Sequence, residues 1–147
     1  MQRLEIRVYA AALAILSLAQ GSLILAGLMP PVFSYSFWDI FFALAELAVI
    51  AHAGLSHSES GPLHCARCGA FMGLAYSLGL CAASIAGLAM SGRPVLGMPY
   101  ANLLTYAFTL AIFVVQNMAL GAAVAMAAAS FDGALRRHSA GNRSSGE

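Results

Sequence analysis

Four long runs of apolar residues, separated by short polar segments, dominate the pattern along the chain. They cover residues 8–29, 37–55, 70–90 and 103–129. A helix needs about 20 apolar residues to cross a bilayer core about 30 Å thick, and each run meets that length. The pattern predicts an all-α, integral membrane protein in which residues 1–133 form a single four-helix transmembrane bundle.

The polar segments contain residues that end or begin helices. Pro30 and Pro31 follow the first run in place of a small-residue cleavage site, so this run is interpreted as a retained span and not as a signal peptide. Ser36 and Asp39 precede the second run with the spacing of a capping box, which predicts a helix start there. Residues 134–147 are polar and short, and we expect them to form a disordered cytoplasmic tail.

Composition supports the membrane interpretation, because 61% of the residues are hydrophobic and only 9% are charged. A soluble domain has about 25% charged residues, which it needs to cover its surface. The lipid bilayer is therefore the expected surrounding of most of the exterior. The net charge of +1 gives no basic patch, and we expect no nucleic-acid partner.

Arginine placement predicts the orientation. In a four-span arrangement, Arg93 lies on one side of the membrane and all other arginines lie on the opposite side: Arg3, Arg7, Arg67, Arg136, Arg137 and Arg143. Because basic residues concentrate in cytoplasmic segments, this bias predicts both termini and the middle connection in the cytoplasm.

Small residues recur at helical spacing in the third run, where they permit close helix packing in lipid. One series predicted to pack is Gly69, Gly73 and Ser77, and a second is Gly79, Ala83 and Gly87. Small residues on two faces suggest a central helix with two neighbours, although one face could instead serve a dimer.

Four polar side chains fall near the middle of three runs and predict a polar layer at mid-membrane: Gln20, Glu46, Gln116 and Asn117. An ionised carboxylate at this depth costs about 2.5 kcal/mol or more, so we expect Glu46 to be neutral, hydrogen-bonded or facing water. Glu46 is either a proton or cation site, or part of a structural hydrogen-bond network.

The segment between the second and third runs holds a cluster of histidines and cysteines: His57, His64, Cys65 and Cys68. These residues supply four ligands of the types that bind zinc or copper, but adjacent His64 and Cys65 do not easily face one ion. Acylation of the two cysteines at the cytoplasmic face is an alternative. The simplest interpretation is a loop with two reduced thiols and no cofactor.

Two functions remain open. The first is a non-enzymatic membrane-organising protein or subunit of a larger membrane complex, with other membrane proteins or copies of itself as partners. In topology it is similar to tetraspan proteins of the MARVEL type. The second is a small proton- or cation-coupled transporter or channel that uses Glu46. Four-span small multidrug transporters also carry one buried glutamate, but in the first span. No catalytic set such as Ser-His-Asp is apparent, which disfavours an enzyme.

Overall fold

The computed structural model describes residues 2–34, 36–92, 95–97 and 102–144. This part of the chain forms four long helices, α1 (Gln2–Leu25), α2 (Phe37–Ser56), α3 (Pro62–Ser91) and α4 (Leu103–Ser144), and two short 3-10 turns, η1 (Val32–Ser34) and η2 (Ser58–Ser60). All four long helices are long and apolar enough to cross a membrane. The prediction of an all-α fold with four helices of this length is confirmed.

Three of the helices extend by several residues beyond the apolar runs that predict them. α1 begins at Gln2, ahead of the run at residue 8, and ends at Leu25, ahead of Gly27, which has a φ of 74°. α3 begins at Pro62, well ahead of the run at residue 70. Proline is favoured in the first helical turn, where its missing N–H is not needed, so Pro62 fixes this start.

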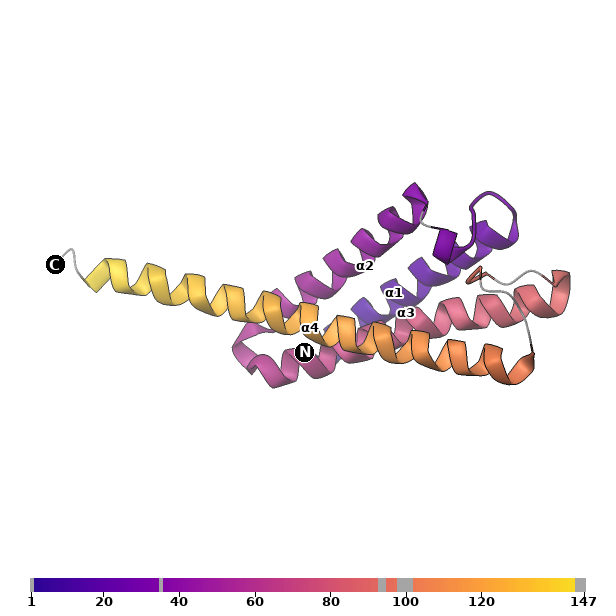
Figure 1. Ribbon diagram of the computed structural model, residues 1–147. Coiled ribbons are helices and arrows are strands. Elements are labelled where there is room, and N and C mark those ends of the chain that lie inside the picture. The colour runs from indigo at the N-terminus through magenta and orange to yellow at the C-terminus, as the bar shows by residue number, and fades with distance from the viewer. Residues whose placement is uncertain (1, 35, 93–94, 98–101, 145–147) are drawn as a thin grey trace.

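The tail also differs from its prediction. Residues 134–144 were expected to be disordered, but they continue α4 as helix, and residues 145–147 lie outside the described part. The continuation contains an ion pair one turn apart, in which Arg136 Nε donates to Asp132 Oδ2 at 2.8 Å. Such pairs stabilise a helix locally. The C-terminal part of α4 projects beyond the other three helices (Figure 1).

The predicted capping box at the start of α2 is confirmed. The backbone N–H of Ser36 donates to Asp39 Oδ2 at 2.8 Å, and the backbone N–H of Asp39 donates to Ser36 Oγ at 3.3 Å. These two bonds satisfy groups that a helix start leaves without intrahelical partners. They also explain why α2 begins at Phe37, at the boundary predicted from the sequence.

The four helices alternate in direction, so that the start of α1, the α2–α3 connection and the distal part of α4 lie at one end of the bundle (Figure 1). Contacts across this end include Ser58 Oγ, which donates to Asp132 Oδ2 at 2.6 Å. At the opposite end, the backbone N–H of Val32 donates to the carbonyl of Val95 at 3.0 Å. We call the first of these the connection end.

α3 packs between α1 and α4 (Figure 1). On its α4 side, Gly69 and Gly73 approach the α4 backbone so closely that an added methyl group would overlap the carbonyl oxygens of Gly121 and Asn117. Glycine at these two positions lets the helix backbones touch, which is how membrane helices commonly associate.

The opposite side of α3 meets α1 through the second small-residue series. A methyl group at Gly79 would overlap Ser17 of α1, and a methyl group at Gly21 of α1 would overlap Ala83. Ser77 is fully buried and donates from Oγ to its own helix, to the carbonyl of Leu74. Gly87 is buried as well. Small residues therefore make the close contacts of α3 with both of its neighbours, α1 and α4.

Large apolar side chains cover much of the exterior of the bundle. Eight of the most exposed are Ile15, Leu28, Phe37, Met90, Leu104, Phe108, Val115 and Phe131. The interior instead contains fully buried serines, such as Ser17 and Ser84. An apolar exterior of this kind is a poor surface for water and a suitable one for lipid.

Replacing Gly73 with alanine tests the contact between α3 and α4. The added methyl group meets the Asn117 carbonyl, so the helices must separate, and overpacking of this kind costs about 2 kcal/mol. We expect a lower thermal unfolding midpoint in detergent. Ala82→Leu, on an exposed position of α3, is the control and leaves the midpoint unchanged. Equal midpoints for Gly73→Ala and the native chain would contradict the close contact.

Candidate functional site

A group of polar side chains lies in the interior of the bundle. Glu46 belongs to the inward stripe of α2, where Phe42 and Ile50 are its buried neighbours one turn away on either side. Gln20 of α1 and Tyr76 of α3 are also buried. The helical repeat of 3.6 residues explains why Glu46 faces inward on an otherwise apolar stripe.

One side-chain hydrogen bond of this group joins α1 to α3. The Tyr76 hydroxyl donates to Gln20 Oε1 at 2.5 Å. The hydroxyl also lies within electrostatic range of the carboxyls of Glu46 and Asp39. Tyr76 was not among the predicted site residues. Its signal in the sequence is a phenol inside an apolar run, because a buried tyrosine hydroxyl usually finds a hydrogen-bond partner.

Glu46 is the least satisfied member of the group. Its side chain is 4% exposed, and Oε1 has no hydrogen-bond partner among the described residues. The chain has no lysine, and among the described residues no arginine pairs with Glu46. Because an unpaired buried carboxylate is costly, the neutral acid is favoured.

On α4, only one of the two residues predicted for the polar layer faces the interior. Asn117 is buried and donates from Nδ2 to the carbonyl of Phe113, in its own helix, at 2.9 Å. Gln116 is exposed on the outside of α4. Adjacent helical residues point about 100° apart, so both amides cannot face the interior. The interior group is therefore Gln20, Glu46, Tyr76 and Asn117, and Gln116 belongs to a different surface.

The histidine and cysteine segment is largely helical and not a loop, because α3 begins at Pro62. His64, Cys65 and Cys68 lie in its first turns, and His57 is the C-terminal cap of α2. Cys65 is fully buried, and its Sγ donates to the carbonyl of His57 at 3.2 Å. This contact makes Cys65 a packing residue between α2 and α3.

The geometry of this segment does not favour a zinc or copper site. The rings of His57 and His64 lie 6.4 Å apart, and all three cysteines are free. Across the described residues, no three side chains of His, Cys, Asp or Glu come together closely enough to hold a metal ion. His57 Nε2 instead lies 3.6 Å from Glu5 Oε2, which links α1 to the connection end.

Acylation of the two cysteines meets a steric obstacle. Cys65 is 0% exposed and Cys68 is 9% exposed, both on the inner side of α3. An acyl donor reaches a thiol only when the thiol is accessible. In this conformation the two thiols fill the interior, so modification would require α3 to separate from its neighbours.

The outer face of α4 carries a second polar feature. Gln116 is exposed there with Ala119, Ala123 and Ala127, which are also exposed. Residues at these spacings fall on one side of a helix. We call Gln116, Ala119, Ala123 and Ala127 the outer face of α4.

No known protein family, curated protein or solved structure matches this chain. The arrangement of its own residues therefore carries the functional argument, and two features stand out: the buried group around Glu46 and the outer face of α4.

Replacing Tyr76 with phenylalanine tests the bond inside the group. The change keeps the ring and removes the donor to Gln20 Oε1, leaving a buried amide without its partner. We expect the free energy of unfolding in detergent to fall by about 1 kcal/mol. Tyr9→Phe is the control, because the Tyr9 hydroxyl is 3.5 Å from Ser56 Oγ at an exposed position. A loss no larger than that of the control would contradict the bond.

Proposed function

We propose that this chain is a multi-pass membrane protein that acts, without catalysing a reaction, as a subunit of a larger membrane assembly. The observation that carries the proposal is the exposed Gln116 amide on the outer face of α4. In the hydrocarbon core, an amide without a hydrogen-bond partner costs about 4 kcal/mol or more. A neighbouring helix that bonds to Gln116 would remove this cost.

Two properties support insertion in a membrane. The first is the apolar exterior of four helices of spanning length. The second is charge placement, because Arg7, Arg67, Arg136 and Arg137 are exposed near the connection end. Arg93, the predicted exception, lies outside the described residues. By the positive-inside rule the connection end faces the cytoplasm, with both termini on that side.

The shape of the outer face supports close association with another helix. Ala119, Ala123 and Ala127 recur at intervals of four residues and present little side-chain bulk. Small residues at this spacing let two membrane helices approach until their backbones touch. The burial of the helices agrees with this, because only 17% of the most apolar stretch of α4 is buried inside the bundle, compared with 50% of the corresponding stretch of α3. The partner is a second copy of the chain or another membrane protein.

Size measurement in a mild detergent tests the assembly. We expect the native chain to purify with at least one stoichiometric partner, and Gln116→Leu or Ala123→Leu to shift the particle mass to that of the monomer, because each change disrupts the outer face. Ala111→Leu, at an exposed position of α4 about 140° from Gln116, is the matched control and leaves the mass unchanged. A monomeric native chain without a partner would overturn the proposal.

A second candidate function is favoured by Glu46. A buried carboxyl with an unpartnered oxygen, in a group that includes Tyr76 and Gln20, suits a site that binds and releases a proton or a small cation. In this proposal the chain is a small transporter or channel. Asp39, at the start of α2, lies two helical turns from Glu46 on the side opposite the connection end.

Proton flux into vesicles tests this second function. We expect the purified chain in proteoliposomes to relax an imposed pH gradient, and Glu46→Gln to lower the rate about tenfold or more while the unfolding midpoint changes little, because glutamine keeps the shape and cannot ionise. Glu59→Gln removes an exposed carboxylate and is the control. A flux that is equal in Glu46→Gln and the native chain would exclude Glu46 as the site.

A further inference from the structure

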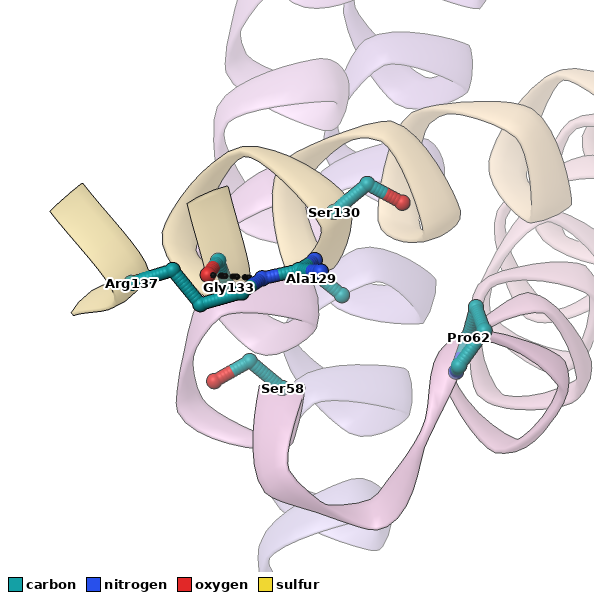
Figure 2. Close-up of a pocket in the computed structure, with 6 residues that line it drawn as sticks. All are labelled: Ser58, Pro62, Ala129, Ser130, Gly133 and Arg137. Atoms are coloured by element: carbon teal, nitrogen blue, oxygen red, sulfur yellow. Dashed lines mark hydrogen bonds between the residues drawn. The ribbon is translucent and has the colours of Figure 1, made fainter. Parts of the chain in front are cut away.

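A crevice opens at the connection end of the bundle. Figure 2 shows it between α4, the η2 turn and the start of α3. Its volume is about 220 Å³, and it is lined by Ser58, Pro62, Ala129, Ser130, Gly133 and Arg137. One cationic side chain and two hydroxyl-bearing residues are thus gathered at one end of an apolar bundle.

The acidic groups beside the crevice are already paired. Arg136 donates to Glu59 Oε1 at 2.7 Å and to Asp132 Oδ2 at 2.8 Å. Asp132 Oδ2 also accepts from Ser58 Oγ at 2.6 Å. Arg136 is thus the ion-pair partner of both carboxylates. The four charged side chains together sum to zero, but Arg137 forms no ion pair of its own among the described residues.

Arg137 lies along α4 and toward the crevice. Its Nε donates to the carbonyl of Gly133 at 3.1 Å, which Figure 2 shows as a dashed line. Nη2 passes over Gly133, where a Cβ atom would sit 4.0 Å away. The bond through Nε holds the guanidinium in place and leaves its terminal N–H groups to bind an anion, with the forked geometry that suits phosphate oxygens.

The start of α3 adds to the attraction for an anion. Pro62, at the first turn of α3, lines the crevice, and the preceding cap residue Gly61 has no side chain to satisfy the first amides. The positive end of the helix dipole therefore points toward the region that Arg137 borders. The Ser58 and Ser130 hydroxyls donate to Asp132 and to the carbonyl of Met126, so among the lining side chains Arg137 is the donor left for an anion.

The position of the crevice along the bundle favours one kind of anion. Exposed apolar side chains continue to this level, with Leu63 at 65%, Phe131 at 65% and Leu135 at 54% exposure. Arg137 lies just beyond them. In the membrane placement proposed above, on which this step rests, the crevice sits where the hydrocarbon ends and headgroups begin. We propose that it binds the phosphate of an anionic phospholipid.

A lipid-binding measurement on the full chain in detergent tests the site. The probes are short-chain phosphatidic acid, the corresponding phosphatidylcholine and inorganic phosphate, each titrated while the unfolding midpoint is followed. We expect phosphatidic acid to raise the midpoint at much lower concentration than the other two. Arg137→Gln weakens this response about tenfold, because a charge-assisted bond to phosphate is lost, and Arg137→Lys retains part of it.

Arg67→Gln is the matched control, because Arg67 is an exposed arginine near the same end that does not line the crevice. It should respond like the native chain. Equal responses in Arg137→Gln and the native chain overturn the site. A response to phosphatidylcholine equal to the response to phosphatidic acid overturns it as well. Inorganic phosphate acting at the same concentration as the lipid overturns the lipid assignment. Particle mass in the same samples reports on assembly separately, so a monomer that binds phosphatidic acid through Arg137 fails only the assembly proposal.

Discussion

Backbone contact between α3 and α4 is the interaction on which the rest of the bundle depends. Asn117 and Gly121, on the inner stripe of α4, meet Gly73 and Gly69 of α3. The same stripe continues to Ala125, whose carbonyl touches α2. In lipid, burying leucine gives little preference for one helix over another, so close contact of small residues must select the neighbours. α4 is thereby held by α3 and α2 along a single row.

This close packing determines what the interior can contain. Where backbones touch, only small side chains fit, and Ser17, Ser77 and Ser84 are fully buried. The larger polar groups, Gln20 and Tyr76, bond to each other in the same interior. Each polar group buried in a medium of low dielectric needs such a partner. Among the described residues, Glu46 Oε1 lacks such a partner, as do Asp39 Oδ1, His57 Nε2 and His64 Nε2. Of these groups only Glu46 lies in the middle of a helix, which is why a proton or cation site is proposed for it.

The sequence was sufficient for the number of helices and for the capping box of α2, because apolar run length and local capping chemistry act within one segment. It could not place the start of α3, since polar side chains such as Arg67 are equally acceptable in a helix and in a loop. It grouped Gln116 with Asn117 by depth, although rotation about the helix axis separates them. The bond from Tyr76 to Gln20 depends on how two distant segments meet, which periodicity alone does not specify.

The length of α4 has a mechanical consequence. Its 42 residues make a rod of about 63 Å, about twice the thickness of a bilayer core. The part beyond the contact at Gly121 is about 35 Å long. Within this part, Asp132 and Arg136 bond to Ser58 and Glu59 of the η2 turn, so α4 is held to the connection end as far as Arg136. A rearrangement of the α2–α3 connection would therefore be transmitted along α4 to its projecting end.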